Sequence, residues 1–293
     1  MVSWRPGPVL RPLLGPVHGY RQAGGEPGIH RGVASPWLTM ILTWDEPLVL
    51  ARGTGLRGYP DLVGGLHLDP ETIVHDGRQE GVQVSLSPLG ASALLGLPAG
   101  ELAFANVEGA AVLPGLAVLR ERLGEAADWP ARFTLIEEFL LGRLDRRGAG
   151  EVRPEVAFGW RRLLQTRGAV GVADLAAETG WSERYLRRRF TEQVGMPPSA
   201  LRRIVRFDAA RTTLRARTVR GAPLGLAELA FAAGYTDQAH LSREFRAFTG
   251  LPPLRYAAAE FGETSLFGEA EPGEVEYGED RSVQDPSGLP GRQ

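Results

Sequence analysis

The chain has 293 residues, of which 43% are hydrophobic, with 33 basic and 35 acidic side chains and a net charge of −2. This composition suits about two folded domains and excludes a wholly disordered protein. The chain has no cysteine, which excludes disulfides and thiolate chemistry. Because it has neither an apolar run of about 18 residues nor the apolar stretch of a signal peptide, we expect a cytoplasmic protein with no membrane partner.

Short β segments separated by glycine and proline dominate residues 1–87. Residues 37–44 are rich in β-formers, and alternation over residues 81–86 places Val82, Val84 and Leu86 on one face. Turn signals recur between these segments. This pattern predicts a small β-barrel or sandwich over about residues 1–87.

Helical patterns follow over about residues 88–147. Ser87 and Pro88 form a helix start that leads into a short helix, and longer patterns cover about residues 113–126 and 130–146. The last of these carries an apolar stripe that either covers the β unit or pairs with a second subunit. The stripe consists of Phe133, Ile136, Phe139, Leu140 and Leu144.

The N-terminal half shows no pattern typical of catalysis. Its four histidines, His18, His30, His67 and His75, are not clustered with carboxylates at metal-ligand spacing. It has neither a nucleophile elbow nor a glycine-rich phosphate loop. We therefore expect no catalytic residue, no metal and no cofactor.

Charge is distributed unevenly along the chain. Residues 1–150 have a net charge of −3, residues 151–261 have +7 and residues 262–293 have −6. A basic domain of this kind is compatible with nucleic-acid binding. The acidic tail is rich in glycine and proline, and we expect it to be disordered. The tail either improves solubility or competes with DNA phosphates for the basic segment.

The basic segment contains an internal repeat. Residues 172–181 resemble residues 226–235 at an offset of 54, and residues 186–190 resemble residues 241–245 at an offset of 55. The second copy therefore has one extra residue in its turn. Each copy has a short apolar helix, a glycine turn and a second helix. This order is typical of a helix–turn–helix unit.

Caps and turns support this interpretation. Gly180 and Gly234 lie where the turns need positive φ, and Ser182 and Asp237 are suited to cap the second helix of each unit. Between the units, about residues 199–217 read as one helix of roughly 27 Å, at about 1.5 Å per residue. That length would place two reading helices near successive major grooves.

Helical spacing separates an inner from an outer face in each second helix. Leu186 and Phe190, and likewise Leu241 and Phe245, point inward. On the outer face, arginine can bond guanine, glutamine can bond adenine and alanine can contact a thymine methyl. The outer positions are Arg184, Arg187 and Arg188 in the first unit and Gln238, Ala239, Ser242 and Arg243 in the second.

Residues 154–258 resemble the DNA-binding domain of the AraC/XylS family of bacterial transcription regulators. The strongest match is residues 233–246, followed by Gly250 and a Pro-Pro pair. The resemblance implies two helix–turn–helix units joined by a long helix. It also implies that the outer positions named above face the groove.

The resemblance also implies a role for residues 1–150. In this family the partner domain is commonly a cupin-like barrel that senses a small molecule or mediates dimerisation. The sequence thus predicts an α+β protein with a sensing domain at 1–150, a DNA-binding domain at 151–261 and an acidic tail. The partners implied are double-stranded DNA, an effector, a second copy and RNA polymerase. The alternative is a bifunctional protein with an enzymatic N-terminal domain.

Overall fold

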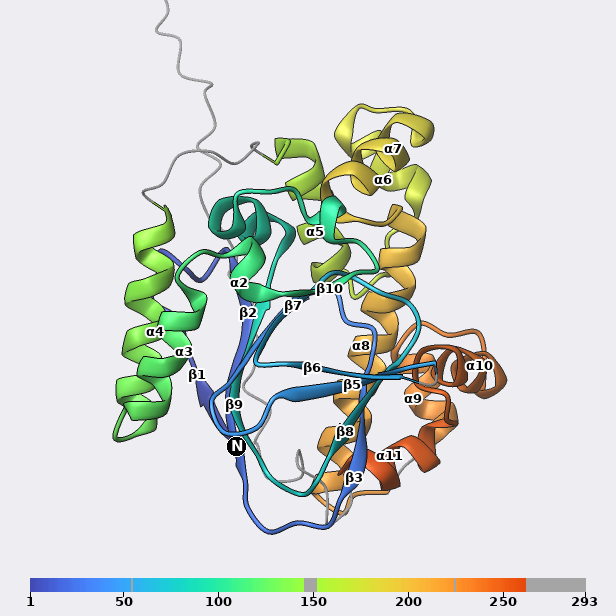
Figure 1. Cartoon of the computed structure of the whole chain (residues 1–293). Coiled ribbons are helices and arrows are strands. Elements are labelled where there is room, and N and C mark those ends of the chain that lie inside the picture. Colours follow the sequence, from blue (N-terminus) through green and yellow to red (C-terminus); the bar gives the residue numbers. More distant parts are fainter. Residues whose placement is uncertain (54, 145–151, 224, 262–293) are drawn as a thin grey trace, which may run out of the picture.

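The computed structural model describes residues 1–53, 55–144, 152–223 and 225–261. The expected domain border near residue 150 and the expected disordered tail, residues 262–293, lie outside these residues. Within them the molecule has an antiparallel β part followed by a helical part, as expected for an α+β protein (Figure 1). None of the described helices combines the length and apolar character needed to cross a bilayer.

The β part consists of two antiparallel sheets. The larger sheet has the strand order β1-β2-β9-β4-β7-β10, and the smaller sheet has the order β3-β8-β5-β6. The strands of the larger sheet are β1 (Val2–Trp4), β2 (Leu14–Gln22), β9 (Gln79–Leu86), β4 (Leu38–Thr43), β7 (Asp61–Gly64) and β10 (Asn106–Glu108). Those of the smaller sheet are β3 (Gly28–Gly32), β8 (Glu71–His75), β5 (Leu48–Arg52) and β6 (Gly55–Tyr59).

The two sheets do not close into a barrel, so the expectation of a cupin-like barrel is wrong. Strand β3 pairs only with β8, which leaves β3 as an edge of the smaller sheet. A helix from the far end of the chain, α11 (Pro253–Phe261), contacts this edge through the side chain of Glu260. Covering a strand edge with a helix protects its unpaired backbone groups, so closure by another strand is not required.

Strand β4 is buried on both faces. Met40 and Leu42 belong to the main hydrophobic core on one side, and Ile41 belongs to a smaller core with Leu50 and Ile73 between the sheets. Val82, Val84 and Leu86 of β9 are buried as the alternation predicted.

Helices cover the outer side of the larger sheet. The predicted start at Ser87 is confirmed, because its hydroxyl accepts a hydrogen bond from the Gly90 amide at 2.9 Å. In the predicted apolar stripe, Phe133 stacks on Trp4 of β1 with ring centroids 5.6 Å apart. The stripe therefore packs on the sheet, and its pairing with a second subunit stays a prediction. The elements here are α1 (Pro88–Gly90), the π-helical turn η1 (Ala91–Leu95), the 3₁₀ turn η2 (Ala99–Leu102), α2 (Gly109–Val112), α3 (Leu116–Glu125) and α4 (Trp129–Leu144).

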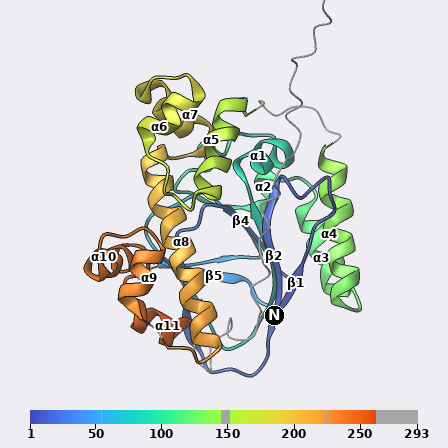
Figure 2. The same cartoon turned by 180° about the vertical axis from the view of Figure 1, so that it is seen from behind.

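The helical part follows the repeat found in the sequence. One short helix pair, α6 and α7, lies near the start of the 22-residue helix α8, and the other, α9 and α10, lies beside α8 further along (Figures 1 and 2). Helix α8 begins one residue before the expected range and ends two residues after it. The elements are α5 (Pro154–Gln165), α6 (Val172–Thr179), α7 (Glu183–Val194), α8 (Pro198–Val219), α9 (Leu226–Ala232), α10 (Gln238–Thr249) and α11.

The β part and the helical part share one hydrophobic core. Trp37 meets Trp160 of α5 edge to face, with ring centroids 5.1 Å apart. Gly100 of η2 lies so close to α7 that an added Cβ would be 2.1 Å from the carbonyl oxygen of Glu192. Burial, followed by the charges of Arg215 and Arg211 in α8, lowers the pKa of His18 in β2 to about 4. The N-terminal half therefore touches the first helix pair, and its His18 lies within the electrostatic influence of the linking helix.

Candidate nucleic-acid interface

Local hydrogen bonds determine where the second helix of each pair begins. These two helices, α7 and α10, are called the outer helices. Ser182 accepts a hydrogen bond from the Tyr185 amide at 3.3 Å, and Asp237 accepts one from the His240 amide at 2.6 Å. Gly180 and Gly234 have φ of +69° and +73°. These four predictions are confirmed, and they explain why α7 and α10 start one residue after their caps.

Replacing Asp237 with alanine should reduce the free energy of unfolding by about 1 kcal/mol, because one amide at the start of α10 loses its acceptor. Asp237→Asn keeps an acceptor and is the matched control. Urea unfolding of both variants measures the effect. Equal stability of Asp237→Ala and the unchanged chain would show that the cap does not hold α10 in place.

Each outer helix is anchored by its predicted inner face. Leu186 and Phe190 in α7, and Leu241 and Phe245 in α10, are fully buried. In the second unit, Phe207 of α8 meets the Phe245 ring at 5.0 Å between centroids. Aromatic contact of this kind holds the second helix pair on the linking helix.

The predicted outer positions of α7 are all exposed to solvent. Arg184 and Arg187 have no ion pair with any other described residue, whereas Arg188 lies 3.7 Å from Glu192. Arg188 also lies over the ring of Tyr185. The helix therefore presents two free guanidinium groups and one that is held by weak local contacts.

The outer positions of α10 carry fewer charges. Gln238, Ala239 and Arg243 are exposed, and Ser242 is half-buried. Within the described residues Arg243 has no ion pair. The structure therefore brings together on the outer face of each helix the side chains that the spacing predicted, and all except Ser242 are exposed.

Other arginines of the basic segment have structural contacts. Arg203 of α8 donates from Nε and Nη2 to the buried carboxylate of Glu244 in α10, with the shortest of three contacts at 2.7 Å. Arg206 lies over the ring of Tyr235 at 5.4 Å. These contacts join α8 to the second unit. No local sequence pattern predicts the pair of Arg203 and Glu244, because the two residues are 41 positions apart.

The end of α11 is joined to the N-terminal half by charged groups. Nδ1 of His30 in β3 donates to Glu260 at 2.6 Å, and Nη1 of Arg31 donates to the same carboxylate at 3.2 Å. The side chain of Glu260 is only 3% exposed. Burial favours its neutral form, but the bonds from His30 and Arg31 outweigh burial and lower the pKa of Glu260.

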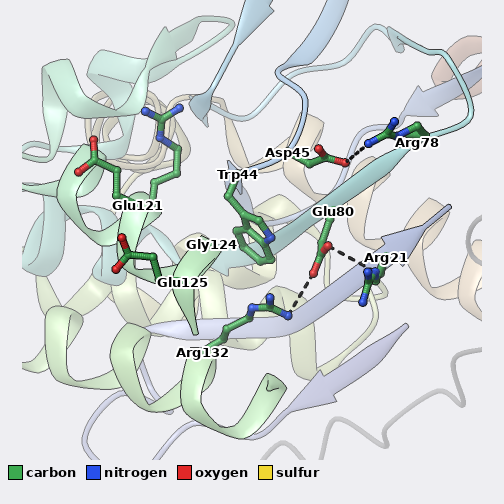
Figure 3. A pocket seen from close by; sticks show the side chains of 10 residues that line it. Arg21, Trp44, Asp45, Arg78, Glu80, Glu121, Gly124, Glu125 and Arg132 are labelled. Carbon is green, nitrogen blue, oxygen red and sulfur yellow. Dashed lines mark hydrogen bonds and ion pairs between the residues drawn. The ribbon is translucent and has the colours of Figure 1, made fainter. Parts of the chain in front are cut away.

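A hollow of about 750 Å³ lies in the N-terminal half, between the larger sheet and helix α3 (Figure 3). Glu80 pairs with Arg132 at 3.1 Å and with Arg21 at 3.4 Å, and Asp45 pairs with Arg78 at 3.4 Å. Eight of its ten lining residues are charged. The hollow is lined by Arg21, Trp44, Asp45, Arg78, Glu80, Arg120, Glu121, Gly124, Glu125 and Arg132.

Among the described residues, no three histidine, aspartate or glutamate side chains gather closely enough to hold a metal ion. The histidines expected to be structural have ordinary contacts instead. His67 bonds the Asp69 carbonyl at 2.7 Å, and His18 lies 3.2 Å from the Ser3 hydroxyl.

Residues 175–259 match the family model of the helix-turn-helix domain. This range extends from α6 to α11 and so includes both helix pairs and the linking helix. No curated protein matches the chain.

Several solved structures are similar to this chain. An apo form of a ToxT variant from Vibrio cholerae is 11% identical and has a TM-score of 0.50, and the match covers 83% of this chain and 97% of that one. ToxT with a bound unsaturated fatty acid is 9% identical, with coverages of 84% and 95% and a TM-score of 0.47. The C-terminal domain of AraT, a response regulator from Geobacillus stearothermophilus, is 20% identical, with coverages of 44% and 100% and a TM-score of 0.33. The first match shows that the arrangement of a sheet domain and a helical domain is a known fold.

Proposed function

Since residues 175–259 form an AraC-type helix-turn-helix domain of a transcription regulator, we propose that α7 and α10 read one DNA duplex in successive major grooves. One observation carries this proposal. Both reading helices expose unpaired arginine, and they are separated by a continuous helix of 22 residues. At about 1.5 Å per residue this helix is roughly 33 Å long, close to the approximately 34 Å of one DNA turn.

The proposed base contacts follow from side-chain chemistry. Arg184, Arg187 and Arg243 can each offer two parallel donors to O6 and N7 of guanine. Gln238 can bond adenine, and Ala239 can contact a thymine methyl group. Arg188 and Ser242 complete the set with phosphate or base contacts.

Replacing Arg243 with alanine should weaken binding to a duplex selected from a random pool by about 1–3 kcal/mol. The preference at one base pair should be lost, because the removed group read that base. Arg246→Ala is the matched control, since Arg246 lies one turn further along α10 and outside the proposed base-reading set; its loss should weaken binding equally on every duplex. Fluorescence anisotropy on duplexes with single base changes measures both effects. An equal loss on every duplex would make Arg243 a phosphate contact.

We propose that the N-terminal half makes DNA binding responsive to an effector. Two contacts connect it to the reading units, at Gly100 beside α7 and at Glu260 of α11. The hollow beside α3 is the candidate effector site. A change in the sheet domain would reach both units through these contacts. Pairing with a second copy and contact with RNA polymerase remain further proposals of the same function.

The alternative of an enzymatic N-terminal domain has no support in the comparisons. The paired charges of the hollow also differ from a catalytic arrangement, because Glu80 and Asp45 are both held by arginines. We therefore place no catalytic residue in this chain.

A further inference from the structure

The helical part carries positive charge that the described structure does not neutralise. Arg184 and Arg187 in α7, Arg243 and Arg246 in α10, and Arg255 in α11 are exposed and form no ion pair with a described residue. We call these five residues the free arginines.

Two carboxylates of α7 and α10 are already paired with other arginines. Glu192 lies beside Arg188 and Arg189, and Glu244 is bonded by Arg203. The free arginines are therefore available to bind an anion through charge-assisted hydrogen bonds.

The acidic tail follows directly after this region. Helix α11 ends at Phe261 and packs against α10. The next part of the sequence, residues 263–280, has seven acidic residues and no basic residue. A chain of 32 residues can span at most about 105 Å, at about 3.3 Å per residue. Residues 262–293 are therefore long enough to reach the free arginines of both units.

We propose that the acidic tail, residues 262–293, binds the free arginines and competes there with DNA phosphates. This inference rests on the proposed function, because it assigns a second occupant to the same surface. Carboxylates and phosphates bind arginine through the same charge-assisted hydrogen bonds. The tail lowers non-specific DNA binding, and a specific duplex displaces it through additional base contacts.

The expected reduction in DNA affinity follows from the covalent attachment of the tail to α11. A flexible tether of moderate length gives an effective concentration on the order of 1 mM, and competition reduces affinity by one plus the ratio of this concentration to the tail's dissociation constant. For weak binding of carboxylates to arginine the reduction is about 3- to 10-fold at low salt. It disappears at high salt, where the ion pairs are screened.

The first test neutralises the tail in the full-length chain. All six glutamates of residues 263–280 are replaced by glutamine, and Asp280 by asparagine. Affinity for a random-sequence duplex should rise about 3- to 10-fold at low salt, and the two proteins should become equal as salt increases. The control replaces Glu46 and Glu108 by glutamine, which changes the net charge of the N-terminal half at exposed positions outside the hollow. Unchanged affinity in the tail variant would overturn the proposal.

The second test detects the tail on the surface directly. The chain has no cysteine, so Ser282→Cys and Thr236→Cys introduce the only two spin-label sites. Thr236 is exposed in the turn before α10. Pulsed electron resonance should show a short-distance population that an added duplex removes. The pair Ser282→Cys and Val118→Cys, with the second label on α3, should lack this population.

The outcomes separate the two proposals. A chain that binds no duplex at any salt concentration contradicts the proposed function. A chain that binds DNA but shows no short-distance population contradicts only the tail proposal, whatever the affinity of the neutralised variant. A short distance that DNA leaves unchanged shows that the tail binds elsewhere, which also overturns the competition.

Discussion

Replacing Arg187 and Arg243 together with alanine should weaken binding to a selected duplex by about 2–6 kcal/mol, the sum of two losses of about 1–3 kcal/mol. Arg187 lies on α7 and Arg243 on α10, and neither shares a partner with the other in the described structure. Additivity is expected for distant groups that act on the same bound state. The predicted loss corresponds to roughly 30-fold to 10⁴-fold in Kd.

The comparison with each single variant makes this test informative. If both units contact the same duplex, the double variant loses the sum of the two single effects. If only α10 reads DNA, the double variant binds as Arg243→Ala does, and the two-unit proposal is wrong. A charge-matched control replaces Arg11 and Arg122, which are exposed in the N-terminal half and lie outside the hollow. At moderate salt this control should bind like the unchanged chain.

The helical units could be predicted because their signals are local. A serine or aspartate cap, a glycine with positive φ and apolar residues four positions apart all act within a few residues. Ser182, Gly180 and Phe190 illustrate each case, and the structure agrees with all three. The same locality explains why the outer arginines of α7 were identified.

The arrangement of the sheets depends on contacts that are distant in sequence. Strand β4 is buried on both faces, so Met40, Ile41 and Leu42 show no alternation of apolar and polar residues. Without this alternation, the sequence does not indicate which strands pair with β4. The sequence therefore predicted strands without showing that they form two sheets. The contact between His30 and Glu260 joins residues 230 positions apart. No local pattern predicts such a pair, and this pair covers the edge that a barrel would have closed.

Replacing both His30 and Arg31 with alanine should reduce the free energy of unfolding by about 3 kcal/mol at neutral pH. The two substitutions remove two side chains that bond the carboxylate of Glu260, whose side chain is 3% exposed. Burying a carboxylate without these bonds is costly, because desolvation is no longer offset. Adding Glu260→Gln to the double variant should restore most of the loss, since the neutral amide carries no charge to desolvate. Chemical denaturation of the three proteins measures these differences, and no recovery in the triple variant would show that packing, not charge, explains the loss.

The pH dependence gives this contact a distinct signature. In the unchanged chain the pKa of Glu260 lies below its ordinary value of 4.5, because the bonds from His30 and Arg31 outweigh burial. A lowered pKa stabilises the folded state fully above about pH 4.5, and this contribution is lost as the pH falls through the lower folded value. In the double variant, hydrogen bonds from His30 and Arg31 no longer offset the effect of burial on Glu260. The pKa of Glu260 should therefore rise, and its carboxylate should take up a proton at higher pH. The stability difference between the two proteins should therefore be largest near pH 7 and shrink on acidification toward pH 4. A difference that stays constant over this range would contradict a charged contact between the sheet domain and α11.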